Sequence, residues 1–315
     1  MNPTITIIIP VFNSEKYINA CLSSVAMQDY EGSVECIIVD DGSVDGSVDV
    51  INTFIAGYHG SVNFSLLQHN ENRKQSAARN TGLDNAHGDY VFFVDSDDLI
   101  EPHTLKSMTE TLSHHPGVEM VQGGVFSNES EIYFWLNHKS WQYHDLMFTD
   151  NRMQIVDMCS QRFGMIPVAP VCKLISRRFL EEHCIRFVEG MFYEDDVFLV
   201  NIAKHLTSVA FCHQNLYYYR VHEQSTMNGG KNIYYNDLQR MWNEIFRLFD
   251  KDFHPSSLLR RIEKDISFYY NRASSFKVKK MLMGIKLRLF NYCPAMLKLR
   301  IIIWTVYRAP FLFIY

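Results

Sequence analysis

The feature that most constrains the fold is the regular alternation of short apolar runs and helical repeats in the first hundred residues. Apolar, β-branched runs predict strands at 4–9, 34–39, 62–67 and 90–94. Apolar residues at helical spacing predict helices near 18–25, 48–55 and 76–86. Strands that alternate with helices imply βαβ crossovers, so we expect an α/β fold with a parallel sheet covered by helices on both faces.

Polar clusters follow three of these expected strands, at the point where each strand ends. They are Pro10–Asn13, Asp40–Asp45 and Asp95–Asp98. Open α/β sheets bind their ligands beyond the carboxyl ends of the strands, and these ends lie along one edge. The sequence therefore predicts one ligand site built from three segments. The first strand is not followed by G-x-G-x-x-G, which disfavours a NAD-type dehydrogenase.

The cluster Asp95-Ser96-Asp97-Asp98 is the most acidic of the three. Two carboxylates separated by one residue can bind one divalent cation, and such hard oxygen ligands suit Mg²⁺ or Mn²⁺. The same string also suits a turn followed by a helix N-cap, so by itself it leaves both readings open. The spacing required for an EF-hand is absent.

Two further charged groups complete the candidate site. Arg73, Lys74 and Arg79 form a cationic patch that would favour a diphosphate. Glu194-Asp195-Asp196 precedes an apolar helix, where acids suit the helix N-terminus. A carboxylate there could also act as a general base toward an acceptor hydroxyl.

Five ordered motifs carry a resemblance to a known family. They are Thr6-Ile-Ile-Ile-Pro-Val-Phe-Asn13, Ile38-Val-Asp-Asp-Gly-Ser-x-Asp45, Ala78-Arg-Asn-Thr-Gly82, Val94-Asp-Ser-Asp-Asp98 and Glu194-Asp195. In order and spacing, over about residues 4–225, the chain resembles the family 2 glycosyltransferases of bacterial polysaccharide synthesis. That resemblance implies the GT-A fold, a Rossmann-like domain that binds nucleotide-diphosphate sugars.

The resemblance also implies roles for individual residues. Asp195 would be the catalytic base, with Asp196 as an alternative. Asp97 would hold Mn²⁺ or Mg²⁺, with Asp98 as a second candidate. Arg220 would contact or close over the diphosphate, and a role for His222 stays open. The donor-binding residues would be Pro10, Phe12, Asn13, Asp40, Asp41, Arg79, Asp95 and Arg220.

Charge is distributed unevenly along the chain. No Asp or Glu follows Asp265, whereas nine Lys or Arg lie between residues 266 and 315. Val278, Leu282, Ile285 and Leu289 form one apolar helical stripe within this basic region. We expect a GT-A domain over 1–225 and a helical, basic, membrane-proximal region over 226–315. Either the helices meet an anionic membrane surface, or they pack on the catalytic domain. Nucleic acid is not expected, because no recognised binding motif accompanies the charge.

Together these features predict an inverting, metal-dependent glycosyltransferase. It would move a hexose or N-acetylhexosamine from a nucleotide-diphosphate sugar, a UDP-sugar in our expectation, to a glycan or lipid-linked saccharide. Seven cysteines without a C-x-x-C pair favour a reducing compartment. We therefore expect a cytoplasmic enzyme, peripheral at the inner face of the cell membrane. The alternative is a catalytically silent subunit of a polysaccharide-assembly complex that binds sugar nucleotides or associates with the membrane.

Overall fold

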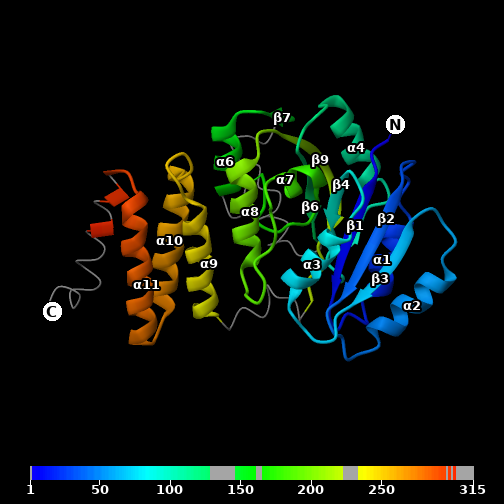
Figure 1. Ribbon diagram of the computed structural model, residues 1–315, viewed down its shortest axis with the longest axis horizontal. Coiled ribbons are helices and arrows are strands. Elements are labelled where there is room, and N and C mark those ends of the chain that lie inside the picture. The colour runs from blue at the N-terminus through cyan, green and yellow to red at the C-terminus, as the bar shows by residue number, and fades with distance from the viewer. Residues whose placement is uncertain are drawn as a thin grey trace.

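The computed structural model describes residues 2–127, 146–160, 165–222, 233–295, 297–298 and 301–302. Figure 1 shows the sheet and its helices at one end of the molecule and α9 to α11 standing side by side at the other. The strands are β1 (Ile5–Val11), β2 (Val34–Asp40), β3 (Asn63–Gln68), β4 (Tyr90–Phe93), β5 (Leu99–Ile100), β6 (Met120–Phe126), β7 (Phe148–Thr149), β8 (Lys173–Ser176) and β9 (Val209–Tyr218). The helices are α1 (Ile18–Ala26), α2 (Ser47–Gly57), α3 (Gln75–Asp84), α4 (Thr104–His114), α6 (Arg152–Ser160), α7 (Arg177–Glu182), α8 (Glu194–His205), α9 (Tyr235–Leu248), α10 (Ser256–Arg272) and α11 (Phe276–Leu289), followed by the short 3₁₀ helix η1 (Phe290–Tyr292).

The described strands form one mixed sheet in the order β3-β2-β1-β4-β8-β6-β9-β5, with β7 paired to β9. The strands β1 to β4 are parallel to one another, as the alternation predicts. The expectation of a wholly parallel sheet is wrong beyond β4, because β8 runs antiparallel to both β4 and β6. β5, β6, β7, α4 and α6 lie between β4 and β8 in the chain, so no single βαβ unit joins these two strands and fixes the direction of β8.

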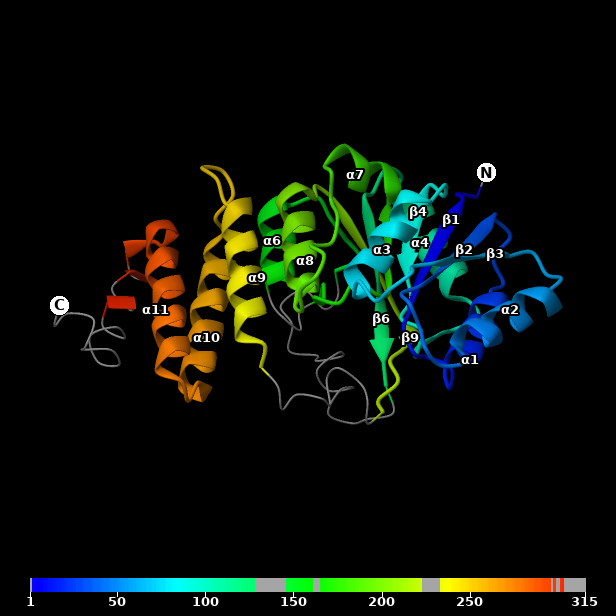
Figure 2. The same ribbon diagram turned by 60° about the horizontal axis from the view of Figure 1, so that its bottom comes forward.

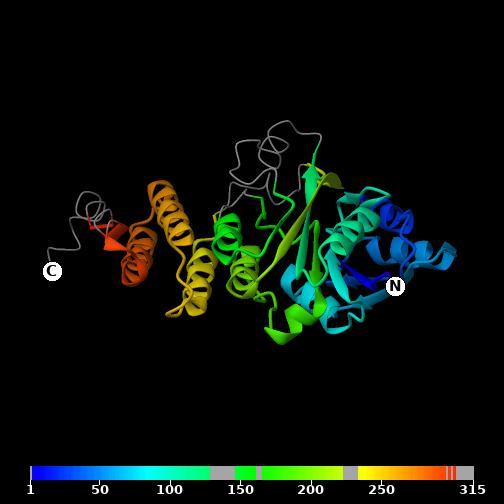
Figure 3. The ribbon, with the colours of Figure 1, turned by 90° about the horizontal axis from the view of Figure 1, so that it is seen from above.

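Strand β1 shows how one sequence run fills both faces of the sheet. Ile7 and Ile9 point to the face covered by α1 and α4, whereas Ile8 points to the face that also holds α6 and α8. Successive strand residues alternate between faces, so a strand buried on both sides is apolar throughout. Seen from above, the two helical layers flank the sheet (Figure 3).

The first helix begins later than Asn13 and Ser14 suggest. It starts at Ile18, and its N-cap residue Tyr17 makes no side-chain capping bond. Neither Asn13 nor Ser14 serves as its N-cap, because both polar residues are used in the strand-end loops. The Ser14 hydroxyl pairs with that of Ser96 at 2.6 Å, and the Asn13 side chain accepts from the amide of Val44 at 2.9 Å.

The helices after residue 233 pack on the sheet-bearing part through a shared apolar core. Side chains of α9, α10 and α11 belong to the same buried cluster as those of α6 and α8. In Figure 2, α9 stands directly beside α8, and α10 and α11 follow in sequence order. Packing on the catalytic domain, one of the two arrangements left open by the sequence, is therefore what these helices adopt.

The apolar stripe of α11 takes part in this packing. Leu282, Ile285 and Leu289 are buried, and Val278 packs against the same cluster. Lys286 is buried as well, and its ammonium lies 2.9 Å from Glu263 and 2.7 Å from the Ser267 hydroxyl of α10. The stripe is therefore not available to enter a membrane. No helix within the described ranges is both long and apolar enough to span a bilayer, and the aromatic run that includes Trp304, Tyr307 and Phe311 lies outside them.

Candidate active site

Arg79 joins two acidic segments that lie 100 residues apart in the chain. Its guanidinium is buried, with the side chain 1% exposed, and it donates to Asp95 and Asp195 at 2.9 Å each. A third carboxylate oxygen, from Glu194, lies 3.5 Å away. The prediction that Arg79 faces a diphosphate thus differs from its position here, because its terminal nitrogens are bonded to carboxylates. Arg79 fixes the strand-end segment relative to the first turn of α8.

Close packing of α3 on the sheet places Arg79 at this point. A Cβ atom on Gly82 would come within 2.4 Å of the Ile8 side chain, so only glycine allows α3 to lie this close to β1. Arg79 stands one turn before Gly82 on the same helix. The first residue of α3, Gln75, adds a 3.0 Å hydrogen bond to the Asp95 carboxylate.

Asp97 and Asp98 differ sharply in their surroundings. The Asp97 side chain is 31% exposed, and its carboxylate lies 2.8 Å from Nε2 of His222. Asp98 is 1% exposed, and its two oxygens accept from the Tyr217 hydroxyl at 2.7 Å and the Arg220 amide at 2.8 Å. The expectation that Asp98 could bind a metal is therefore at odds with its geometry, and Asp97 is the carboxylate left for a ligand.

Arg220 and His222 approach the strand end from the segment after β9. The Arg220 Nε donates to the Asp97 carbonyl at 2.8 Å, and its guanidinium lies over the Tyr17 ring at 5.3 Å. The His222 ring stacks on the same tyrosine at 4.6 Å. The two residues therefore lie beside Asp97. The sequence leads us to expect a bound diphosphate near Arg220 and leaves the role of His222 open.

The first turn of α8 shows the same division between neighbouring acids. The Asp195 side chain is 28% exposed beside Arg79. Asp196 is buried and forms an ion pair with Arg261 of α10. Asp196 is thus paired with the C-terminal helices, whereas the Asp195 carboxylate stays partly exposed beside Arg79.

Asp40 and Asp41 at the end of β2 are both buried. Asp40 accepts from the amide of Ser43, while Asp41 accepts from the amide of Arg73 and lies 2.6 Å from Nδ1 of His69. Gly42 has a φ of +75°, a left-handed value that favours glycine, and an added Cβ atom would lie 2.8 Å from the backbone of Glu71. These two carboxylates therefore hold the loop that follows β2 and the segment before α3.

The remaining predicted donor residues come from the end of β1. Pro10 belongs to the strand, and the Phe12 ring beyond it is 46% exposed at the rim. Asn13 adopts a left-handed φ of 51° and bonds the loop that follows β2. The three polar clusters therefore meet at one sheet edge, as the sequence predicts.

Burial raises the pKa of Asp195, and the positive charge of Arg79 works in the opposite direction. Burial, followed by repulsion from Asp195, raises the pKa of Glu194 to about 7. Burial is also the main reason that the pKa values of Asp97 and Asp98 are raised, and the neighbouring Asp95 adds to both effects. Arg79 keeps its charge because attraction to Asp195 and Asp95 outweighs the burial that would lower its pKa.

The donor set around Asp97 fits a divalent cation. Acidic side chains outnumber the arginines here: Asp95, Asp97, Asp98, Glu194 and Asp195 surround Arg79 and Arg220. A cation would relieve this excess of negative charge, and carboxylate oxygen is a preferred ligand of Mg²⁺ and Mn²⁺. Within the described ranges no group of three or more His, Cys, Asp or Glu is arranged to hold a metal ion. Any cation bound at Asp97 would take most of its ligands from substrate oxygens and water.

Sequence reasoning missed several residues that organise this site. Tyr217 links the Asp98 carboxylate to the amide of Asp95, and Lys173 is buried within electrostatic reach of Asp195. Burial lowers the pKa of Lys173 to about 8. Neither residue stands in a polar motif; the only hint is a polar group inside an apolar strand run.

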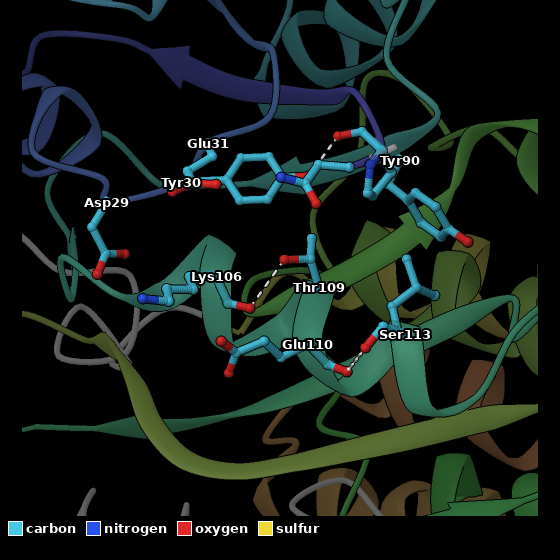
Figure 4. A pocket seen from close by; sticks show the side chains of 11 residues that line it. Asp29, Tyr30, Glu31, Tyr90, Lys106, Thr109, Glu110 and Ser113 are labelled. Carbon is cyan, nitrogen blue, oxygen red and sulfur yellow. Dashed lines mark hydrogen bonds between the residues drawn. The ribbon is translucent and has the colours of Figure 1, made fainter.

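A cavity of about 480 Å³ lies at the opposite edge of the sheet, near the amino ends of β1 and β4 (Figure 4). Tyr30, Tyr90, Lys106 and Glu110 are among the residues that line it. None of the predicted site residues lies there. Since ligands of α/β sheets bind at the carboxyl ends, the cluster around Arg79 is the candidate active site.

The same fold occurs in solved glycosyltransferase structures. The chain is similar to residues 1–349 of TarS from S. aureus in complex with UDP-GlcNAc, with a TM-score of 0.72, 20% identity, and coverage of 92% of this chain and 82% of TarS 1–349. It is also similar to the mannosyltransferase PcManGT from Pyrobaculum calidifontis, with a TM-score of 0.60, 18% identity, and coverage of 98% and 82%. The fold is GT-A, the class of nucleotide-diphospho-sugar transferases.

The sequence itself places the chain within that class. The model of glycosyl transferase family 2 matches residues 6–184, and the chain belongs to this family. It is 31% identical to glycosyltransferase GlyA of Streptococcus pneumoniae over 246 residues, which is 76% of this chain and 32% of GlyA. It is 26% identical to glycosyltransferase GlyG of the same organism over 233 residues, 72% of this chain and 74% of GlyG. The chain thus spans about a third of the length of GlyA.

Proposed function

We propose that the protein is an inverting, metal-dependent glycosyltransferase that moves a hexose or N-acetylhexosamine from a nucleotide-diphosphate sugar to a saccharide acceptor. One observation carries the proposal. Arg79 holds Asp95 and Asp195 through one guanidinium, so the segment suited to a metal and the carboxylate suited to a base face the same space. An inverting transfer needs these two functions on either side of the anomeric carbon.

In this mechanism Asp195 accepts the proton of the acceptor hydroxyl as that oxygen attacks the anomeric carbon. Arg79 keeps the Asp195 carboxylate oriented, and the raised pKa brings the base closer to the working pH. Asp97, with the imidazole of His222 beside it, would hold Mn²⁺ or Mg²⁺. When bound, the cation neutralises charge on the diphosphate leaving group. Phe12, Asn13 and Arg220 would contact the donor when it is bound next to Asp97.

A UDP-sugar is the donor that we favour. A neighbour of the same fold, TarS, is known in complex with UDP-GlcNAc, and PcManGT is known with GDP-Man and Mn²⁺. These ligands support a nucleotide-diphosphate sugar and a divalent cation here. We further propose that the acceptor is a growing or lipid-linked glycan and that the enzyme works at the cytoplasmic face of the membrane. Its C-terminal helices would present exposed cations such as Lys277, Lys280 and Arg288 to anionic lipid.

A donor screen tests the enzymatic proposal. Purified protein is incubated with UDP-, GDP- and TDP-sugars, with and without Mn²⁺, and released nucleoside diphosphate is measured together with the anomeric configuration of the product. We expect release from at least one donor, loss of release in EDTA, and an inverted product. Binding of a donor without any release, with or without acceptor glycans, would favour the alternative of a silent sugar-nucleotide-binding subunit.

A separate assay tests the membrane proposal. Flotation with vesicles that contain anionic or only neutral lipid is compared for the full chain and for a variant in which Lys277, Lys280 and Arg288 are each replaced by Gln, which should bind the anionic vesicles more weakly. Binding to anionic vesicles that disappears in high salt supports the proposal. Equal recovery with neutral vesicles, or none with either, would refute it.

A further inference from the structure

Three cationic side chains surround the loop that leads into the catalytic turn of α8. Arg73 lies 2.9 Å from Glu189, and the Lys74 ammonium lies 3.3 Å from the Gly190 carbonyl. From α9, the Arg240 guanidinium lies 3.7 Å from the position a Cβ on Gly190 would take. Gly190 and Arg240 are exposed, so these charges meet at the surface and not in the interior.

The acids near this loop do not balance the cations. Glu189 is paired with Arg73, and the Asp237 carboxylate accepts from the backbone amide of Phe192 at 3.2 Å. Within the part of the chain that the structure describes, no carboxylate forms an ion pair with Lys74 or Arg240. Two positive charges therefore stay available to a ligand.

A stacked pair of aromatic rings lies beside Lys74. The rings of Phe192 and Tyr234 stack at 4.2 Å, and the Lys74 ammonium lies 4.5 Å from the centre of the Phe192 ring. The Tyr234 side chain is exposed. Aromatic faces with an adjacent polar group are suited to the apolar face of a sugar ring.

The position of this surface near Asp195 indicates that it would contact the acceptor and not the donor. Tyr193 turns with a left-handed φ of 66°, and Asp195 follows two residues later. Lys74 directly precedes α3, whose Gln75 and Arg79 bond to Asp95. This surface therefore adjoins the turn that carries Asp195, which is where the proposed reaction needs its acceptor.

We infer that this surface is an acceptor subsite for an anionic saccharide. Tyr234, which is supported by Phe192, receives a sugar ring, and Lys74 and Arg240 bind a phosphate or carboxylate carried next to it. The inference rests on the proposed transfer reaction and narrows its acceptor class. Cations placed near the aromatic pair and Gly190 select an acceptor by charge, because a neutral sugar leaves them without a partner.

Matched pairs of acceptors test this inference on the full chain. One pair is a phosphate-bearing oligosaccharide and its phosphatase-treated form; the other is a uronate oligosaccharide and its carboxyl-reduced form. With a donor that the wild type uses, we expect kcat/KM to be at least about tenfold higher for one anionic member than for its neutral partner. The pair that shows the preference distinguishes phosphate from carboxylate. The preference should shrink between 50 and 500 mM NaCl, because exposed charges are screened.

Substitution of the two cations tests whether this surface causes the preference for an anionic acceptor. Lys74→Gln and Arg240→Gln should each raise the KM for the anionic acceptor about fivefold, with a smaller change for the neutral one. Arg247→Gln is the matched control, since it removes a cation two turns further along α9 that is paired with Glu244. Equal use of charged and neutral acceptors by the wild type would overturn the inference, as would an Arg247→Gln effect as large as that of Arg240→Gln. If the wild type turns over no donor at all, it is the proposed transfer reaction that fails.

Discussion

The two acidic segments of the site, Asp95–Asp98 and Glu194–Asp196, follow one plan with different supports. In each segment one carboxylate stays partly exposed and its neighbour is buried against a distant element. Asp97 is open while Asp98 is held by Tyr217 and Arg220, and Asp195 is open while Asp196 is held by Arg261. The strand-end segment is supported by the sheet, whereas the helical turn is supported by the C-terminal helices.

Adjacent acidic residues in one motif therefore have different structural surroundings and different expected roles. The open member can meet a ligand, and the buried member fixes the backbone that presents it. Substitutions can test this division of roles, because each segment contains one partly exposed and one buried carboxylate.

The largest effect is expected at the open carboxylate of the strand end. Asp97→Asn should lower metal-dependent turnover by about 10³-fold or more, since the ligand for the cation is lost. Turnover across a Mn²⁺ titration measures this loss. Asp98→Asn is the control and should keep the Mn²⁺ dependence while lowering the melting temperature. Full activity of Asp97→Asn would show that the metal assignment is wrong.

Asp195→Asn should lower transfer by roughly 10²–10⁴-fold, because the amide cannot accept the acceptor proton. Donor affinity, measured by calorimetry with the donor and Mn²⁺, should change little. Asp196→Asn should instead reduce stability and retain most of the transfer rate. The reverse result would assign the base to Asp196.

Arg261→Met should destabilise the fold by about 3–5 kcal/mol, since it leaves the buried Asp196 carboxylate without its partner. Urea unfolding at pH 7 measures the free energy. Arg178→Met, which removes an exposed partner of Glu182, is the control and should leave the unfolding midpoint unchanged. An equal midpoint for the two variants would contradict the structural role of the Asp196–Arg261 pair.

The smallest effect concerns the pH dependence of stability. Glu194 has a folded pKa of about 7 against an ordinary value of 4.5, so the folded protein binds more protons than the unfolded chain between these values. Stability should therefore fall as pH rises from about 4.5 to 7, by at most roughly 3 kcal/mol. Glu194→Gln should flatten the unfolding free energy over pH 5–8. An unchanged slope would show that Glu194 does not titrate in this range.

The sequence predicts the parallel half of the sheet and the meeting of three polar clusters well. Local periodicity marks β1 to β4, and parallel topology alone brings their ends together. The roles within each acid pair could not be predicted in this way. Which neighbour is buried depends on Tyr217, Arg220 and Arg261, residues that approach from 65 to 122 positions away. The reversed direction of β8 and the inward-facing stripe of α11 likewise depend on tertiary packing.

The pairing of Asp196 with Arg261 has a consequence for the order in which the protein is made. The helix that carries the proposed base is synthesised 65 residues before the arginine that completes its first turn. At about 5–20 residues per second, the nascent sheet waits about 3–13 s for that partner. During this interval the Asp196 carboxylate lacks its counter-charge and the apolar face of α8 lacks α9. The first turn of α8 can therefore reach its final arrangement only after α10 has been made, so the C-terminal helices determine when this part of the site is complete.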